Sequence, residues 1–357
     1  MESSNTNPYD RDFALTRSPS QYIAYGALIL LLLGAPWLVS DYLLSQATFI
    51  LIYGVVGLGL MLLCGYTGLF SIGHAAFLGI GAYTEAALAA KGVPIPISMA
   101  AAAILCAVAG VIVGLPAIRV KGIYLAIATL AFCFIVEEIF VRWDSVTGGN
   151  VGRSVTPVPT YFSGLESGQQ FYLICALVAI LSTVFVLNLL RSPTGRALIA
   201  LRDSEISAQS MGIPVAFYKS LSFALSAALT GVGGALYAHQ IQFLTPDQFG
   251  VAQSIDLIMM LMIGGLGSVH GAFLGAIFLI SMPPLIGWAK DFLPSAVAQS
   301  AGVQGFVYGA ILVICVLLEP HGMYGRWIKI RTAIAMFPLY PVGMFRRQKA
   351  YLKSERA

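Results

Sequence analysis

Polar residues and glycines interrupt one stretch of an otherwise very hydrophobic chain, from Gly65 to Tyr83. The candidate residues within that stretch are Thr67, Gly68, Ser71, Gly73 and His74. The hydroxyl and imidazole groups supply hydrogen bonds, and the glycines allow close packing or a departure from ideal helix. Lipid cannot satisfy freed backbone groups, so irregular backbone at membrane depth must be buried in protein or line a watery cavity. The stretch therefore indicates a pathway or a gate.

Ionisable groups inside apolar runs are the other candidates, because they are costly in lipid and are functional suspects by default. Glu85 lies eleven residues after His74, or about three helical turns along the same span. It either belongs to the pathway or is a carboxyl hydrogen-bonded to a neighbouring helix. Asp256 either caps its helix or faces an outer vestibule. If both carboxylates couple to ions, the chain is a secondary transporter or a channel.

Motifs for catalysis and for nucleotide binding are missing from the sequence. It contains no GxxxxGK[ST] loop, so any ATP that drives the protein must bind to another chain. The four histidines are scattered, and the five cysteines fall singly inside apolar runs without metal-ligand spacing. A hydrolytic enzyme would bring such groups together in a recognisable motif. The sequence thus predicts a protein that is not an enzyme and carries no cofactor, no metal and no nucleic acid.

Membrane-spanning helices must position these residues. Hydrophobic residues make up 58% of the chain and charged residues only 10%, whereas soluble proteins carry about 25% charged residues. The segments between polar breaks mostly reach the roughly 20 apolar residues that a helix needs to cross a bilayer. We expect an all-α polytopic membrane protein with about ten transmembrane helices and a broken or re-entrant segment near 65–74. The expected spans are 22–39, 46–64, 74–90, 97–115, 123–141, 170–190, 219–238, 254–267, 270–287 and 303–318.

The distribution of positive charge predicts the orientation of these spans. If residues 1–21 form a cytoplasmic tail, the inner segments hold sixteen of the twenty Lys and Arg residues. With an even number of spans in the membrane region 22–318, both termini are then expected in the cytoplasm. The connection 142–169 would be an ordered outer loop. The C-terminal tail 319–357 is basic and too broken to span, so we expect it to lie along the anionic inner leaflet.

The inner loop 191–218 contains signals for two short helices. The pair Ser192-Pro193 is a typical helix start, and Asp203 or Ser204 could cap a second helix. Gly212 fits a C-terminal stop. An amphipathic helix pair on the cytoplasmic face is a docking surface for a partner, and the alternative is an interfacial loop that lies on lipid headgroups.

A faint internal repeat supports the importance of the broken stretch. The sequence SIGHAAFLG at 71–79 is similar to SVHGAFLG at 268–275, and both enter the membrane from the inner side in the predicted topology. The two copies are expected to run parallel, and Ser268 and His270 join the pathway candidates. Repeats of broken helices often flank the central site of a transporter. The abundance of Gly, Ala, Leu and Phe in this chain would also produce so short a match.

Two sets of motifs resemble one family, the inner-membrane permeases of branched-chain amino acid ABC importers (LivH and LivM). The first is GYTGLFSIGHAAFLGIGAY at 65–83. The second runs through the inner loop and the following span as SPTGR, LRDSE, MGI and GGALYA, between residues 192 and 238. The resemblance covers about residues 46–325, and the basic end of the chain is more similar to the LivM branch than to the shorter LivH branch.

The resemblance implies a subunit of an ATP-driven importer in a bacterial inner membrane. Its partners would be membrane lipid, a second LivH-like permease, two LivG/LivF-like subunits that bind ATP and Mg²⁺, and a periplasmic substrate-binding protein. The substrate would be a branched-chain amino acid, or urea or a short amide, because urea permeases share the fold in outline. The implied ATPase-coupling residues are Arg196, Arg202, Asp203, Glu205 and Gly212. The candidate pathway or gate residues are Thr67, Gly68, Ser71, Gly73, His74, Glu85, Ser268 and His270.

Overall fold

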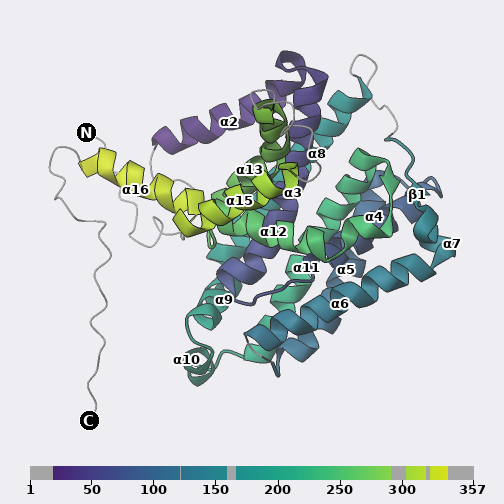
Figure 1. The fold of residues 1–357 in the computed structure, drawn as a ribbon. Helices are drawn as coiled ribbons and strands as arrows, with labels where there is room; N and C mark the ends of the chain where they lie inside the picture. The colour runs from purple at the N-terminus through teal and green to yellow at the C-terminus, as the bar shows by residue number, and fades with distance from the viewer. Residues whose placement is uncertain (1–18, 121, 159–165, 291–302, 319–321, 337–357) are drawn as a thin grey trace, which may run out of the picture.

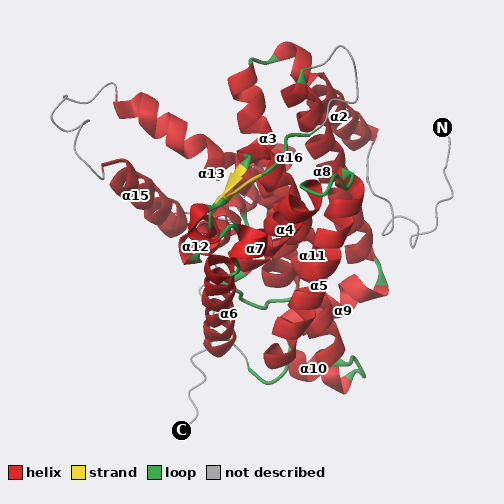
Figure 2. Cartoon of the chain, turned by 90° about the vertical axis from the view of Figure 1, so that its right-hand side faces the viewer, coloured by secondary structure: helices red, strands yellow, loops and turns green. Residues whose placement is uncertain are grey.

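The computed structural model describes residues 19–120, 122–158, 166–290, 303–318 and 322–336, which fold almost entirely into helices (Figure 1). A short antiparallel ladder joins β1 (Arg153–Ser154) to β2 (Phe243–Leu244), and it is the yellow element in Figure 2. The prediction of an all-α protein is thus confirmed. Most of the two predicted tails, at 1–18 and 337–357, lies outside the described residues.

The helices follow the apolar runs closely. The longer helices are α2 (Pro19–Leu38), α3 (Asp41–Leu60), α4 (His74–Ala89), α5 (Ile95–Ala117), α6 (Ile123–Arg142), α8 (Ser167–Arg191), α11 (Val215–Ile241), α12 (Val251–Gly264), α13 (Val269–Lys290), α15 (Val303–Leu318) and α16 (Gly322–Met336). The short ones are η1 (Met61–Tyr66), α7 (Asp144–Thr147), η2 (Gly149–Val151), α9 (Pro193–Asp203), α10 (Glu205–Ser210) and η3 (Pro246–Phe249).

A helix matches each of the ten predicted spans, but only six helical segments of the described chain are long and apolar enough to cross a membrane. They are Asp41–Tyr66, Ile95–Ala117, Ile123–Arg142, Ser167–Arg191, Val215–Ile241 and Val269–Trp288. The count of ten spans is therefore not confirmed. The shortfall has a physical reason at α4 and α12, because their 16 and 14 residues give lengths of about 24 and 21 Å, less than the ~30 Å hydrocarbon core.

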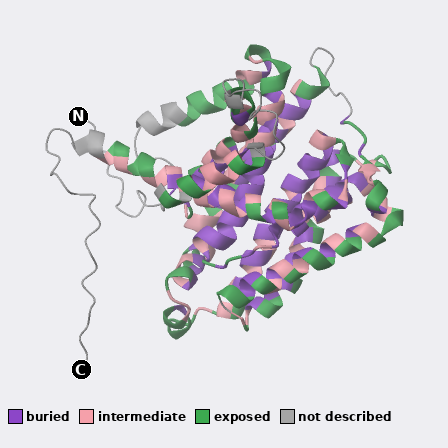
Figure 3. Ribbon diagram, in the orientation of Figure 1, coloured by how far each residue is buried: buried purple, intermediate pink, exposed green. Residues whose placement is uncertain are grey.

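Small residues let α11 pack closely at the centre of the bundle. A Cβ atom built on Gly81 of α4 would lie 2.3 Å from the carbonyl oxygen of Gly231, and one on Gly59 of α3 would lie 2.7 Å from that of Ser226. A Cβ on Gly110 of α5 would lie 2.6 Å from the carbonyl oxygen of a further α11 residue. Figure 3 shows buried residues in this central region and exposed residues along α2 and α6. Close backbone approach of this kind is typical of helix packing in membranes.

The chain breaks where the sequence predicts it. The helix α3 passes into the π-helix η1, residues 67–73 form no regular helix, and α4 starts at His74. Gly68 adopts a left-handed φ of 74°, which glycine tolerates without a steric penalty. The buried side chains on this segment include Thr67 and Ser71, at 3% and 0% exposure. The irregular backbone is therefore enclosed mainly by protein, as an apolar environment requires.

A second break separates α11 from α12. Residues 242–250 turn at Gln242, which has a φ of 61°, then form β2 and η3. Gln253 of α12 donates a hydrogen bond to Tyr53 of α3 at 2.9 Å, and a Cβ built on Gly57 would lie 2.9 Å from Met260. These contacts show that α12 runs parallel to α3 and begins beside its middle. The predicted eighth span, 254–267, thus starts and ends three residues earlier, as α12.

The loop 191–218 folds as the predicted pair of helices, α9 and α10. Ser192 Oγ accepts a hydrogen bond from Gly195 N at 3.3 Å, and Ser204 Oγ accepts one from Ser207 N at 3.2 Å. Of the two predicted caps for the second helix, Ser204 is the one observed. Gly212 follows α10 with a left-handed φ of 82°, which ends the helix as expected.

Candidate functional site

His74 starts α4 and joins it to α11. Its Nε2 lies 2.7 Å from Ser226 Oγ, which itself donates to the carbonyl oxygen of Gly59 at 2.6 Å. Because a serine hydroxyl has a single proton, Ser226 must accept from His74 Nε2–H. If the ring carries a single proton, the other ring nitrogen, Nδ1, accepts from Ser71 Oγ at 3.2 Å. The ring is fully buried, and both of its nitrogens have partners within the chain.

The first turn of α4 is held by two other helices. Ala75 N donates to Ser254 Oγ of α12 at 3.0 Å, and Ile72 N donates to Thr129 Oγ of α6 at 3.0 Å. A Cβ built on Gly73 would lie 2.1 Å from the carbonyl oxygen of Thr129, so only glycine fits there. The start of α4 is consequently fastened to α6, α11 and α12 at once.

The other end of the break lies against the loop 191–218. Thr67 Oγ1 donates to the carbonyl oxygen of Leu62, in the first turn of η1, at 2.9 Å. A Cβ built on Gly68 would lie 3.1 Å from Arg202 Cγ. The break thus touches α9 directly.

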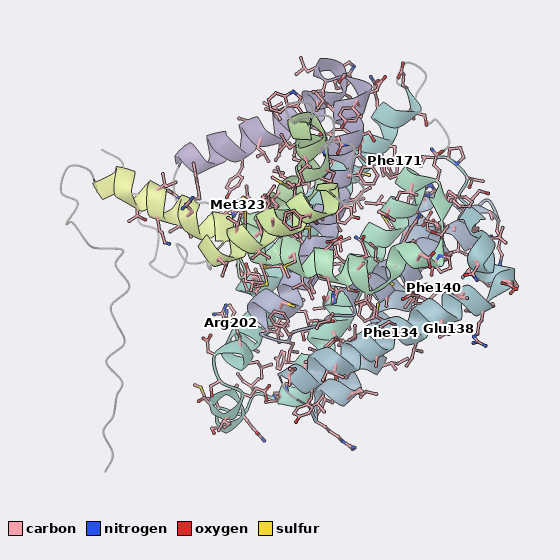
Figure 4. All side chains as sticks on the ribbon, viewed as in Figure 1. Phe134, Glu138, Phe140, Phe171, Arg202 and Met323 are labelled. Carbon is pink, nitrogen blue, oxygen red and sulfur yellow. The ribbon has the colours of Figure 1, made fainter. Side chains whose placement is uncertain are left out.

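Arg202 is the residue that connects α9 to the break. Its Nη1 donates to the carbonyl oxygen of Gly65 at 3.2 Å, and its Nη2 lies 3.1 Å from Asp203 Oδ1 (Figure 4). Gly65 in turn packs on the turn before α13, since a Cβ there would lie 2.8 Å from Gly267 N. A guanidinium that bonds a helix-terminal carbonyl satisfies an acceptor which the helix itself leaves free. Arg202 therefore links α9 to the end of η1.

A second contact ties α10 to the bundle. Lys219 of α11 is 1% exposed, and its Nζ lies 2.7 Å from Glu205 Oε1 and 3.4 Å from the carbonyl oxygen of Ala117 at the end of α5. The buried ammonium thus has a carboxylate and a backbone acceptor, as a desolvated charge needs. By contrast, Arg196 is exposed and donates to the carbonyl oxygen of Arg191 on the preceding helix. Arg202 and Glu205 thus both attach the loop to the bundle.

Ser268 and His270 lie at the start of α13. Ser268 Oγ accepts from Gly271 N at 2.9 Å and caps the helix. His270 is hydrogen-bonded to Tyr25 of α2 at 3.0 Å and stacks on Tyr324 of α16, with ring centroids 5.4 Å apart. These side chains connect helices at the same end of the molecule as Gly65 and α9.

Glu85 lies at the opposite end of α4 in a buried polar cluster. Its Oε1 accepts from Ser98 Oγ of α5 at 2.7 Å and lies 2.9 Å from His239 Nε2 of α11. His239 Nδ1 is 3.2 Å from the carbonyl oxygen of Thr156, in the loop after β1. A carbonyl only accepts, so Nδ1 carries a proton. The geometry matches the alternative in which Glu85 bonds to neighbouring helices, and His239 also joins the loop that contains Thr156 to the bundle.

The partners of the predicted residues were not identified from the sequence. Ser226 and Ser254 bind the start of α4, while Ser98 and His239 bind Glu85. One usable signal existed, because Ser222, Ser226 and Thr230 recur every four residues along α11 and so form a polar stripe on one helix face. No local pattern marks the others, whose sequence separation from their partners reaches 179 residues.

Comparisons with known proteins agree with this architecture. A family model for the permease component of branched-chain amino acid transport systems matches residues 42–316. The chain is 32% identical over 323 residues to the high-affinity branched-chain amino acid transport system permease protein LivM of Escherichia coli K12, covering 83% of this chain and 73% of that one. No solved structure is significantly similar to the chain.

More distant relatives show the breadth of the similarity. The chain is 25% identical over 230 residues to the probable branched-chain amino acid transport permease protein LivM of Methanocaldococcus jannaschii, covering 62% of this chain and 67% of that one. It is 27% identical over 221 residues to the autoinducer 2 import system permease protein LsrC of Enterobacter sp. strain 638, covering 58% of this chain and 62% of that one.

Proposed function

The chain belongs to the family of permease components of branched-chain amino acid transport systems, and from that premise we propose that it is the multi-pass membrane subunit of an ATP-driven importer for leucine, isoleucine and valine. ATP and Mg²⁺ bind to two partner ATPases. A second permease completes the membrane part, and a periplasmic protein delivers the substrate. The complex lies in a bacterial inner membrane, with both termini of this chain and the loop 191–218 in the cytoplasm.

The contact between Arg202 and Gly65 supports this mechanism most directly. The helix pair α9–α10 is the docking surface for an ATPase, and Ile206 and Met211 leave large apolar side chains 76% and 82% exposed there. When the ATPases close, they move this pair. Arg202 carries the movement to the end of η1, and Glu205 carries it to Lys219.

The broken segment is the gate in this proposal. The π-helix η1 is a less stable alternative to the α-helix and is frequently found at functional sites, so its rewinding costs little. The start of α4 is held separately, through His74, so movement at Gly65 changes residues 67–73, which lie between the moving end of η1 and the fixed start of α4. Substrate choice depends mostly on the delivering protein, because no dense cluster of charges is found at mid-bundle in the described residues.

Uptake by cells that lack the chain tests the proposal. Restoring the chain should restore uptake of labelled leucine, which an excess of isoleucine or valine should inhibit and urea should not. Inhibition by urea alone would support the urea or short-amide alternative. Uptake that persists when both ATPases are deleted would support an ion-coupled transporter and contradict the proposal.

A further inference from the structure

The helix α16 projects sideways from the bundle (Figure 1). Its 15 residues give a length of about 22 Å, less than the ~30 Å hydrocarbon core. It is not among the six segments of the described chain that are long and apolar enough to cross a membrane. It begins where Gly322 packs on Gly265, at the end of the molecule that carries α9. A helix that starts at that end and does not span is placed to lie along the membrane surface.

One face of α16 mixes arginines with large apolar side chains. Its exposed residues are Arg326, Trp327, Ile328, Ile330 and Arg331, and the exposure of Trp327 is 59%. At 3.6 residues per turn these five side chains spread over little more than half of the helix circumference. Tryptophan is enriched at the boundary between lipid and water, and an arginine there keeps its stem in lipid and its charge at the headgroups. The exposed face of α16 therefore suits that boundary.

The charge of α16 selects the kind of lipid. The helix contains Arg326, Lys329 and Arg331 and no acidic residue. The sequence that follows, 337–357, adds five Lys or Arg residues and one Glu. Each basic residue near an anionic leaflet strengthens the attraction by about fivefold, and guanidinium groups form paired hydrogen bonds with phosphate oxygens. An anionic phospholipid is thus the complementary ligand.

The position of α16 argues against an ATPase as its partner. Figures 1 and 2 both show α16 well apart from α10, which carries the proposed ATPase surface. The large apolar side chains between the arginines would also face water in a purely ionic protein contact, whereas they enter the acyl region in a lipid contact.

The start of α16 touches the turn that supports η1. A Cβ built on Gly322 would lie 2.4 Å from Gly265 Cα. In the same turn, Gly267 N donates to Met61 Sδ of η1 at 3.0 Å. Residues 265–267 are therefore in contact with α16 on one side and with the π-helix on the other.

A ring stack fixes α16 to α13 just after that turn. The rings of Tyr324 and His270 are stacked, with centroids 5.4 Å apart and planes inclined by 1°. His270 is also hydrogen-bonded to Tyr25 at 3.0 Å. A force on α16 is consequently borne by the start of α13 and by the turn before it.

We propose that the exposed face of α16 binds anionic phospholipid headgroups of the inner leaflet, and that this binding holds the turn 265–267 against η1. With the turn fixed, displacement of Gly65 by Arg202 moves the gate residues 67–73 and not the turn. Transport then depends on lipid composition as well as on ATP. The inference rests on the proposed function for the orientation of the chain and for the gate, and it adds a lipid ligand that regulates that gate.

Photoactivatable lipids test the binding face in the assembled complex. Nanodiscs carry the same small fraction of photoactivatable phosphatidylglycerol or phosphatidylcholine, and mass spectrometry maps the labelled residues. Residues 326–331 should be labelled preferentially by phosphatidylglycerol. The exposed apolar residue Ile104 of α5 should show no preference between the two lipids. No preference at 326–331, or the same preference at Ile104, would overturn the inference.

Two paired substitutions identify the charges responsible. Arg326→Gln with Arg331→Gln should lower the preference for phosphatidylglycerol at 326–331 by roughly fivefold or more. Lys91→Gln with Arg142→Gln is the matched control, because both residues are exposed at the other end of the molecule, and it should leave the preference unchanged. An unchanged preference in the α16 variant would overturn the inference, as would loss of ATPase from that variant with the lipid preference intact.

ATPase measurements test the connection to the gate. Replacing phosphatidylglycerol with phosphatidylcholine should lower substrate-stimulated ATPase activity of the wild-type complex by roughly fivefold or more. In Tyr324→Ala, which removes the ring stack, activity should be low in both lipids while labelling at 326–331 persists. Tyr324→Phe keeps the stack and should retain the lipid response. If Tyr324→Ala does not fold, His270→Ala removes the same stack from the other side.

The two measurements separate this inference from the proposed function. A wild-type complex whose ATPase activity ignores the lipid, or a Tyr324→Ala complex that still responds to it, contradicts the regulation. Leucine transport without a lipid preference at α16 contradicts this inference alone. A lipid preference at α16 in a complex that does not transport leucine contradicts the proposed function alone.

Discussion

His74 illustrates how one buried side chain can position a helix. Both its ring nitrogens are used, on Ser226 and on Ser71. His74→Ala should therefore destabilise the protein by about 2–4 kcal/mol, because it opens a cavity, removes the partner of the buried Ser71 hydroxyl and removes the donor to Ser226. Thermal unfolding in detergent measures this loss. His270→Ala, at an exposed position, is the matched control and should cost less.

Transport kinetics of the same variant separate anchoring from substrate contact. If His74 only anchors α4, the His74→Ala protein that remains folded should keep the wild-type KM for substrate. A KM increase of about tenfold or more, which corresponds to at least 1.4 kcal/mol of lost binding, would instead place His74 in the pathway.

Two substitutions of Glu85 should distinguish whether its hydrogen bonds or its charge stabilise the protein. In Glu85→Gln the amide oxygen can take the place of Oε1 and still accept from Ser98 Oγ, so we expect a small effect on the unfolding temperature. Glu85→Ala leaves Ser98 and His239 without that partner and should cost about 1–3 kcal/mol. It should also expose the loop that contains Thr156 to protease. Equal effects of the two substitutions would contradict this assignment.

Local signals made some residues predictable and others not. The helix starts at Ser192 and Ser204 and the stop at Gly212 were readable, because a cap depends on neighbours within four residues. The partner of Glu85 was not readable, because His239 lies 154 residues away. Only the folded arrangement of α4 and α11 brings the two together.

At the scale of helices, close packing of α4 on α11 should be sensitive to a single methyl group. In Gly81→Ala the new Cβ would approach the carbonyl oxygen of Gly231 to 2.3 Å, so the helices must separate, at a cost of about 1–3 kcal/mol. Gly168→Ala is the matched control, since no atom lies within 4 Å of its Cβ. Comparable unfolding temperatures of the two variants would show that α4 and α11 are not packed this closely.

The helices α9 and α10 give a second prediction at this scale. Arg202→Ala removes the bond to Gly65, so it should lower substrate-stimulated ATPase activity of the assembled complex by roughly fivefold or more, the lower end of usual coupling energies. Arg119→Ala is the control, because Arg119 is exposed at the same end of the molecule but outside the loop. Unaltered stimulation in Arg202→Ala would mean that the coupling does not pass through Gly65.

Hydrophobicity predicted which segments are helical better than which of them span the membrane. Every predicted apolar run is a helix, yet α4 and α12 begin inside the bundle after a break. A run of apolar residues does not show the depth at which its helix starts, since a buried start and a lipid-exposed span have the same composition. The hydrogen bonds of Ser254 and Gln253 show where α4 and α12 start within the bundle, and both bonds join residues far apart in the sequence.

At the scale of the whole molecule, several elements meet at one end. Tyr25 near the start of α2 contacts His270, and a Cβ built on Gly322 at the start of α16 would lie 2.4 Å from Gly265 Cα. Arg202 of α9 contacts the same region through Gly65. The first and last described helices thus begin at the end of the molecule that carries α9, as the charge distribution indicates.

Reporter fusions test the orientation of that end. A fluorescent protein that matures only in the cytoplasm should be bright when fused to either terminus, and alkaline phosphatase, which needs the periplasm, should be inactive there. The reason is the excess of Lys and Arg in the segments assigned to the inner side. Active phosphatase at either terminus would contradict the proposed topology.

Uptake into proteoliposomes tests the central claim, that this permease works in an ATP-driven importer. Vesicles that contain the purified complex should accumulate leucine only with the periplasmic protein outside and ATP at the ATPases. Omitting ATP, or replacing it with a nonhydrolysable analogue, should abolish accumulation while an ion gradient is kept. Accumulation by this chain alone, driven by the gradient and indifferent to ATP, would contradict the account.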